Sequence, residues 1–313
     1  MSESRGDPAD ELSELERTQE AVSFRRSLVD RAKNAAKNDP DLSTNDRIRL
    51  FTYQRLLDRL FTESSAGSDM WVLKGATSLL CRYLVVRSSK DIDLATRQSL
   101  DAAEETLRSA LRKDAGDHLN FQIRTVTELE RRSEGRRIAL SVTCAGTELS
   151  AFHIDLISSI QFPEHLDYVT PKQPIALDGL EIIPYPSWPL VNAVADKVAA
   201  TFELYNGRPS TRYRDLVDLF LLRRYGEFDL VKLRTAIHTE FDRRHLGLPM
   251  EFSVPDPSAW QKGWGKIARG DAPFLAEVPF DEALIAIREF LHPVFASEAE
   301  GLWDVENGRW VLD

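Results

Sequence analysis

Residues 71–96, WVLKGATSLLCRYLVVRSSKDIDLAT, are the stretch of sequence that indicates the fold most clearly. The stretch begins with a short apolar run, Trp71-Val72-Leu73, which stops at Lys74-Gly75. A mostly apolar segment follows from residue 76 to 86, and a second short run carries Asp91-Ile92-Asp93. Short apolar runs bounded by glycine or charge are typical of buried strands, whereas the middle segment has leucines at helical spacing. The stretch therefore predicts a strand, a tight turn, a helix and a second strand.

The second strand carries two acids on one face. Asp91 and Asp93 alternate with apolar residues, and alternate residues of a strand share a face. Two carboxylates about 7 Å apart can hold one or two Mg²⁺ ions, which take hard oxygen ligands and share them with substrate phosphates. At Gly75, backbone N–H groups at a helix start can approach a phosphate closely. The two acids and the glycine turn together predict a phosphoryl or nucleotidyl transfer site. Taken alone, the two acids could lie at a solvated strand end, and Gly75 could form an ordinary turn.

A third acid lies further along the chain. Strands are expected at 121–126, 137–144 and 149–157, and the middle one alternates strictly between apolar and polar residues. Asp155 is an acid in the otherwise apolar third strand, and a buried carboxylate is costly unless it is paired or bound to metal. The plainer alternative is an acid at the end of an edge strand. His153 shares the face of Asp155, and we expect at most an indirect role for it.

The second half of the chain is predicted to be helical. Pro184, Pro186 and Pro189 mark the boundary, after which helices are expected at 188–205, 212–224, 230–243, near 259–268 and at 281–290. Before this boundary, residues 162–178 are expected to be irregular and residues 180–183 to form a short strand. A small hairpin is expected around Asn307-Gly308 near the C-terminus. Lys197 is the single lysine of an apolar helix, so it is either a surface lysine with a buried stem or a cation for a triphosphate. Asp215 shares a helix face with Asp218, for which a surface pair with Arg214 is the plain explanation.

Composition restricts the class of protein. The 313 residues are 42% hydrophobic and 29% charged, which is ordinary for a globular protein. A formal net charge of −10 argues against non-specific coating of nucleic acid. The basic residues clustered at 131, 132, 136 and 137 are expected to form a solvated surface. No apolar run is long enough to span a membrane, and the polar N-terminus does not look like a secretory signal. The two cysteines are expected to be buried thiols, which suits a cytoplasmic location.

Two segments resemble a known family. The sequences YQRLLDRLF, WVLKGATSLL and RSSKDIDL, within residues 53–94, resemble the AbiEii/MenT nucleotidyltransferase toxins of the polymerase-beta-like nucleotidyltransferase superfamily. Lys197, followed by TRYRDLVDL at 211–219, is similar to the helical lysine and R-x-[KR]-D-x-x-D-L helix of that family, so the likeness extends to Leu222. The superfamily has Gly-Ser or Gly-Gly where this chain has Gly75-Ala76, a change that removes a hydroxyl but leaves the backbone.

The resemblance implies an α+β fold with a nucleotidyltransferase-type mixed sheet, flanking helices and a mostly helical C-terminal region. Combined with the pattern along the chain, it predicts a mobile N-terminus at 1–15, a nucleotidyltransferase domain with N-terminal helices at 16–184, and a helical domain at 185–313 that contributes Lys197 and Asp215 to the site. The first N-terminal helix is expected at 16–37, and the second is expected to begin at the capping residues 43–46, starting with Ser43.

The resemblance also implies a function. It suggests a Mg²⁺-dependent bacterial toxin that transfers a nucleotide from an NTP to tRNA 3′ ends, releases pyrophosphate and blocks translation. By analogy with the family, the NTP would be CTP or UTP. Its implied partners are tRNA and a cognate antitoxin. Two alternatives stay open: transfer to a protein or small molecule, and a non-catalytic nucleotide-binding module.

Roles for individual residues follow from the same resemblance. The implied Mg²⁺ ligands are Asp91, Asp93 and Asp155. The implied nucleotide-binding residues are Lys74, Gly75, Ala76 and Lys197. Asp215 would orient Lys197 or contact the nucleotide. Ser88 and Ser89 lie next to the acids, where a phosphate would repel metal or NTP, so modification there by the partner is a further hypothesis.

Overall fold

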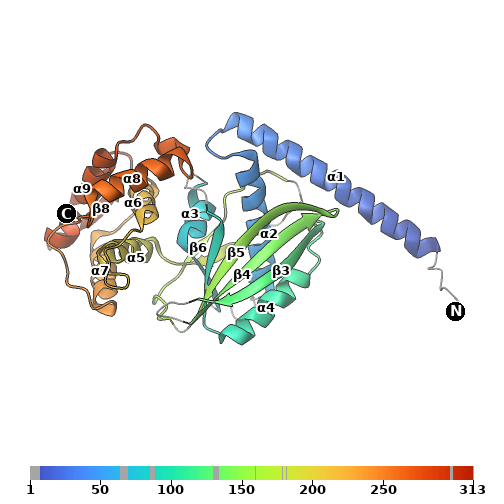
Figure 1. Cartoon of the computed structure of the whole chain (residues 1–313), viewed down its shortest axis with the longest axis horizontal. Coiled ribbons are helices and arrows are strands. Elements are labelled where there is room, and N and C mark those ends of the chain that lie inside the picture. The colour runs from blue at the N-terminus through green and yellow to red at the C-terminus, as the bar shows by residue number, and fades with distance from the viewer. Residues whose placement is uncertain are drawn as a thin grey trace. The chain divides into compact units, whose positions relative to one another are not determined.

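The computed structural model describes residues 8–63, 70–84, 89–129, 134–158, 160–177, 179–180, 182–296 and 299–312 (Figure 1). Ser88 and the first seven residues of the expected mobile N-terminus lie outside these ranges. The chain forms two compact units. The first comprises Met1–Leu73, Lys90–Gln161 and Tyr168–Pro186, and the second comprises Lys74–Ser89, Phe162–Asp167 and Ser187–Asp313.

A mixed seven-stranded sheet, in the order β3-β4-β5-β2-β1-β7-β6, is the centre of the fold. Its strands are β1 (Trp71–Lys74), β2 (Asp91–Thr96), β3 (Leu119–Glu128), β4 (Gly135–Cys144), β5 (Thr147–Ile157), β6 (Asp167–Val169) and β7 (Tyr185–Ser187). Strands β3, β4 and β5 pair antiparallel, whereas β2 and β5 pair parallel. The predicted mixed sheet is therefore confirmed.

The hairpin of β4 and β5 contains a β-bulge close to its turn. Thr143 pairs with Glu148, but Val142 pairs with Ser150, so Leu149 is the extra residue. Beyond the bulge, Ile138 lies opposite Ile154, and both are fully buried. The bulge thus aligns the apolar faces of the two strands along the rest of the hairpin.

Three helices accompany the sheet in the first unit: α1 (Pro8–Asn38), α2 (Thr44–Glu63) and α4 (Leu100–Arg112). The first begins at Pro8, earlier than the expected start at Glu16. As predicted, α2 begins after Ser43, whose Oγ accepts a hydrogen bond from the backbone N–H of Asp46. Figure 1 shows α2 and α4 beside the strands β3–β5, and residues of α2 contact β5 while those of α4 contact β3.

A buried ion cluster ties α2 to the segment before β3. The Asp117 side chain is fully buried and accepts hydrogen bonds from Arg59 Nη2 at 2.7 Å and Arg55 Nε at 2.7 Å. Burial alone would raise the pKa of Asp117, but the guanidinium groups of Arg59 and Arg55 outweigh it and lower that pKa. The cluster therefore favours the folded state as long as Asp117 is ionised.

The second unit is mostly helical, as expected for the C-terminal region. It contains α3 (Gly75–Tyr83), α5 (Leu190–Phe202), α6 (Tyr213–Tyr225), α7 (Leu230–Arg243), α8 (Pro257–Arg269), the short 3₁₀ helix η2 (Pro273–Leu275) and α9 (Phe280–Ala296). The predicted hairpin around Asn307-Gly308 is present as β8 (Gly301–Asp304) and β9 (Arg309–Leu312). Its Trp303 and Trp310 pack on Phe290 of α9.

One expected strand is misplaced. A strand was predicted from Leu180 to Ile183, but the described residues of that range are not in a strand, and β7 forms two residues later with Pro186 inside it. Strand β6 forms in the segment from Phe162 to Asp178, which was expected to be irregular. Both strands have only three residues, too few for a periodic pattern to be recognised.

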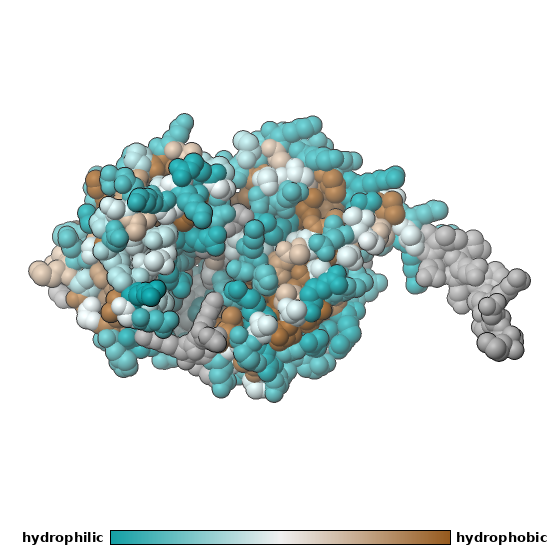
Figure 2. All heavy atoms as spheres, viewed as in Figure 1, coloured by the Kyte–Doolittle hydropathy of each residue, from teal (hydrophilic) through white to brown (hydrophobic). Residues whose placement is uncertain are grey.

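The visible surface is largely hydrophilic, with apolar residues scattered over it (Figure 2). In the described part of the chain, no helix has the combined length and apolarity that a bilayer crossing requires.

Candidate active site

The three predicted acidic ligands lie on one face of two neighbouring strands. Strand β2 pairs with β5 so that Asp93 is the register partner of Asp155, and Asp91 is the partner of His153. Neighbouring strands are about 4.8 Å apart, and directly opposite residues point to the same side of the sheet. Asp91, Asp93 and Asp155 are therefore gathered in one small area of the sheet in the first unit.

Asp155 forms an ion pair with an arginine of β4, which neighbours β5 on the side away from β2. Its side chain is only 3% exposed, and Arg137 of β4 is its antiparallel register partner. Arg137 donates from Nε to Oδ1 at 2.7 Å and from Nη2 to Oδ2 at 2.9 Å. The hydrogen bonds to Asp155, with the charges of Asp91 and Asp93, raise the pKa of Arg137. Arg137 thus lies in the electrostatic field of all three acids.

Asp91 is more exposed to solvent than Asp155. His153 Nδ1 lies 3.5 Å from Asp91 Oδ1, and both side chains are partly exposed. On the side of α2, Tyr53 is almost fully buried with its ring against Phe152. Burial raises the pKa of the Tyr53 phenol, and the negative charge of Asp91 adds to the rise. Of the three acids, His153 contacts Asp91.

The donor chemistry of this group fits a hard divalent cation. Three carboxylates on one sheet face are the oxygen ligands that Mg²⁺ takes. Among the described residues, however, no three acidic, histidine or cysteine side chains already form a metal-binding cluster. The contact between Asp155 and Arg137 supplies a physical reason, since both oxygens of Asp155 are directed to the guanidinium. Asp91, Asp93 and Asp155 are the residues that would hold the ion.

The predicted turn between strand and helix is present in the second unit. Strand β1 runs directly into α3 at Gly75, whose φ of +63° lies in the left-handed region that favours glycine. Lys74 has extended backbone, and its Nζ lies 4.0 Å from the ring centroid of Trp188, a cation–π contact. Ala76 is buried. The turn therefore presents a helix N-terminus next to a lysine, without a hydroxyl at position 76.

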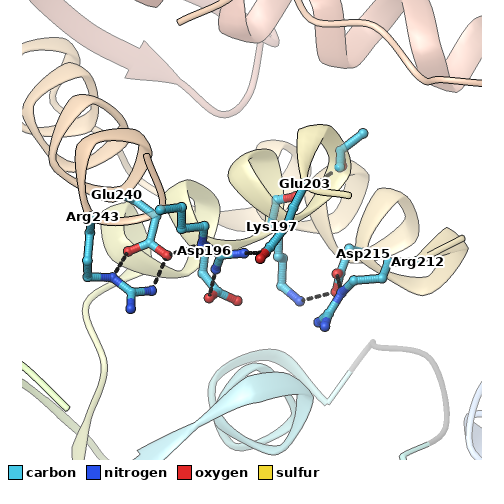
Figure 3. A network of polar contacts seen from close by, with 9 residues as sticks. Asp196, Lys197, Glu203, Arg212, Asp215, Glu240 and Arg243 are labelled. Atoms are coloured by element: carbon cyan, nitrogen blue, oxygen red, sulfur yellow. Dashed lines mark hydrogen bonds and ion pairs between the residues drawn. The ribbon is translucent and has the colours of Figure 1, made fainter. Parts of the chain in front are cut away.

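Lys197 is buried in a group of acids (Figure 3). Its Nζ donates to Asp218 Oδ2 at 2.6 Å and to Asp215 Oδ1 at 3.2 Å. Arg212 donates from Nε to the other oxygen of Asp215. The interpretation of Lys197 as a surface lysine is therefore wrong, and so is a surface pair of Asp218 with Arg214, because the Asp218 side chain is fully buried.

The charges around Asp215 are strongly coupled. Burial alone would raise its pKa, but the Lys197 ammonium and the Arg212 guanidinium outweigh that effect and lower the pKa of Asp215 to about 2. Asp215 is thus ionised at neutral pH and joins α5 to the N-terminal end of α6. Of the two roles predicted for Asp215, the geometry favours orientation of Lys197.

Sequence reasoning missed a second charged network on the same helices. Arg244, at the end of α7, contacts Glu240 at 2.6 Å, Glu203 at 2.7 Å and Asp196 at 2.5 Å, and its side chain is only 9% exposed. Figure 3 labels these three acids. Asp196 directly precedes Lys197 on α5. The network fixes α5 against α7 and so helps to position the helix that carries Lys197. These acids are scattered in the sequence and share no motif that could have indicated the network.

Comparisons with known proteins agree with this fold. The model of a family described as "Nucleotidyl transferase AbiEii toxin, Type IV TA system" matches residues 55–290. The match extends well beyond Leu222, where the sequence resemblance ended. A search of curated proteins by sequence finds no match.

Two solved structures are similar to this chain, and the first of them shows the same fold. The nucleotidyltransferase toxin MenT4 of Mycobacterium tuberculosis is 18% identical with a TM-score of 0.50, over 88% of this chain and 96% of the toxin. JHP933 from Helicobacter pylori is 15% identical with a TM-score of 0.47, over 78% of this chain and 91% of its own. Because the family model covers most of the chain, the protein belongs to the AbiEii family of nucleotidyltransferase toxins of type IV toxin–antitoxin systems.

Proposed function

We propose that this protein is a Mg²⁺-dependent enzyme that transfers a nucleotide from CTP or UTP to the 3′ end of tRNA, releases pyrophosphate and thereby blocks translation. The family supports nucleotidyl transfer in a toxin–antitoxin system. The observation that carries the proposal is the position of Asp91, Asp93 and Asp155 on one face of two adjacent strands. A compact set of carboxylates is the donor set for a cation that accompanies a triphosphate.

In this proposal the first unit binds the cation. Asp91, Asp93 and Asp155 would hold it, and when bound it would neutralise charge on the triphosphate and on the transferring phosphoryl group. By analogy with the superfamily, Asp155 would also help to deprotonate the attacking hydroxyl once its carboxylate is released from Arg137, which now occupies both of its oxygens.

The second unit would bind the nucleotide. The backbone N–H groups at Gly75 and Ala76 offer hydrogen bonds to phosphate, and Lys74 adds a positive charge. Lys197 would compensate the charge of the departing pyrophosphate. Asp215 would act through Lys197 as a positioning residue, in agreement with its buried contact to the ammonium group. Electrostatic stabilisation of this kind commonly supplies the largest part of the acceleration.

The family also supports an antitoxin partner for this protein. We propose that the antitoxin acts on the toxin in the cytoplasm, and modification of Ser88 or Ser89 is one route by which it could do so. Ser89 is 7% exposed, so a modifying enzyme would need this segment to open. Ser88 lies outside the described residues.

A different acceptor is the second candidate. The net charge of −10 suits a protein or small-molecule acceptor better than a polyanion. A non-catalytic nucleotide-binding module is favoured only by Ala76 in place of the superfamily's serine or glycine.

One experiment tests all three candidates. Purified protein is incubated with Mg²⁺ and each α-³²P-labelled NTP in turn, with either total tRNA or a bacterial extract of proteins and small molecules as acceptor, beside Asp93→Ala and the control Asp101→Ala, which removes an exposed acid of α4. Label on tRNA with the wild type and the control, but not with Asp93→Ala, is the expected result. Label on protein or on a small molecule would reassign the acceptor. Absence of transfer from all four NTPs, by protein that still binds nucleotide, would support the binding module.

A further inference from the structure

The most informative contact outside the proposed chemistry is the one that Arg137 makes with Asp155. The guanidinium uses two N–H groups to reach both carboxylate oxygens, at 2.7 and 2.9 Å. Such a forked pair is the strong form of the arginine–carboxylate interaction. Asp155 is almost completely buried, so it is shielded from water, whereas the Arg137 side chain is 40% exposed. The pair is therefore stronger than an ordinary surface ion pair.

We infer that Arg137 is a built-in counter-cation, which holds Asp155 while the metal is absent and competes with the divalent cation for that carboxylate. The inference rests on the metal site of the proposed function. The three acids carry a formal charge of −3, and Arg137 reduces it to −2. A divalent cation that approaches Asp155 meets a carboxylate whose two oxygens already accept hydrogen bonds, and it meets a positive charge beside them. Both effects weaken metal binding.

The neighbouring Arg136 shows that this placement is specific. It has the same charge and precedes Arg137 on β4, but it points to the other side and contacts Asp101 at 2.6 Å, Glu104 at 2.9 Å and Glu128 at 3.0 Å. The raised pKa of Arg136 derives from Asp101 and Glu128, whereas that of Arg137 derives from the site acids. Arg136 is therefore a matched control for charge and for position in the chain.

The test is a Mn²⁺ titration of the full chain, with free Mn²⁺ followed by electron paramagnetic resonance. We expect Arg137→Gln to bind Mn²⁺ about tenfold more tightly than the wild type, which corresponds to about 1.4 kcal/mol. Arg136→Gln should bind within about twofold of the wild type, because the metal site does not involve it. Asp93→Asn identifies the site, since its loss of binding assigns the measured ion to the acids of β2 and β5.

A second variant and a double mutant complete the design. Arg137→Lys keeps the charge but loses the fork, so its Mn²⁺ affinity should lie between those of the wild type and Arg137→Gln. In an Asp155→Asn background, Arg137→Gln should change the affinity by less than about twofold, because the carboxylate for which the two cations compete is gone.

Three results would overturn the inference. The first is an affinity of Arg137→Gln that equals or falls below that of the wild type while the wild type itself binds Mn²⁺; this leaves the proposed metal site intact. The second is an equal gain in Arg136→Gln, which would indicate a general charge effect. The third is no saturable binding by either the wild type or Arg137→Gln, which would remove the proposed metal dependence as well.

Discussion

The substitution Lys197→Met should destabilise the protein far more than loss of an ordinary lysine. The ammonium of Lys197 lies 2.6 Å from the fully buried carboxylate of Asp218 and 3.2 Å from that of Asp215. With Arg212, the four side chains have no formal net charge, and methionine would leave the group at −1 in the protein interior. Asp215 would keep Arg212, whereas Asp218 would lose its ammonium partner. Removing one partner of a buried ion pair costs about 3–5 kcal/mol.

Urea unfolding followed by tryptophan fluorescence measures this loss. Five of the six tryptophans report on the second unit, namely Trp188, Trp260, Trp264, Trp303 and Trp310. The matched control is Lys232→Met on the exposed side of α7, which should change the free energy of unfolding by at most about 0.5 kcal/mol.

A double mutant separates the charge effect from packing. Lys197→Met combined with Asp218→Asn removes the uncompensated charge, and it should recover about half of the lost stability. A loss below about 1 kcal/mol for Lys197→Met alone would refute the reasoning. It would mean that the carboxylates find other compensation, and that Lys197 is available for the nucleotide without a structural role.

Three other predictions address pH, metal and the first unit. The pKa of Asp215 falls from 3.8 to about 2 on folding. The ionised carboxylate therefore contributes about 2 kcal/mol of stability above pH 4, and this contribution is lost as the pH falls through about 2. In urea titrations, the difference in free energy of unfolding between wild type and Asp215→Asn should stay constant from pH 7 to 5 and shrink below pH 4. Asp93→Asn should reduce nucleotide transfer at least about a hundredfold with an unchanged urea midpoint, and a shifted midpoint would indicate a folding defect instead. Asp117→Asn, which weakens the buried contacts to Arg55 and Arg59, should cost about 3 kcal/mol by far-ultraviolet circular dichroism, and a cost near zero would contradict the importance of that cluster.

The elements with a clear period were predictable from the sequence. The strict alternation at residues 137–144 indicated β4, Ser43 indicated the start of α2, and Asn307-Gly308 indicated the C-terminal hairpin. The pattern of Asp91 and Asp93 placed both acids on one strand face, because that inference needs only the twofold period of a strand. The meeting of Asp93 with Asp155 followed from the family resemblance rather than from any spacing in the chain.

The pairing of charges was not predictable, because it depends on register. The basic residues at 136 and 137 looked like a surface cluster, and only the observed pairing separates Arg137, on the acidic face, from Arg136. Asp218 was equally ambiguous: its spacing from Arg214 allowed a surface pair, whereas Arg214 contacts Asp271. Helical spacing shows which residues share a face, but it does not show which partner the packing brings to them.

The bulge at Leu149 restricts how the length of this hairpin can vary. If Leu149 were paired instead of bulged, the pairing of Cys144 with Thr147 would continue regularly and would bring Arg137 opposite Ile154 instead of Asp155. A one-residue shift moves every side chain of a strand to the other face, so the guanidinium would be directed into the apolar core. A two-residue change would preserve the faces. We therefore expect a relative that lacks one residue between the turn and Asp155 to have a regular hairpin with the arginine still opposite the acid, and a single added residue there to separate the two unless a further bulge absorbs it.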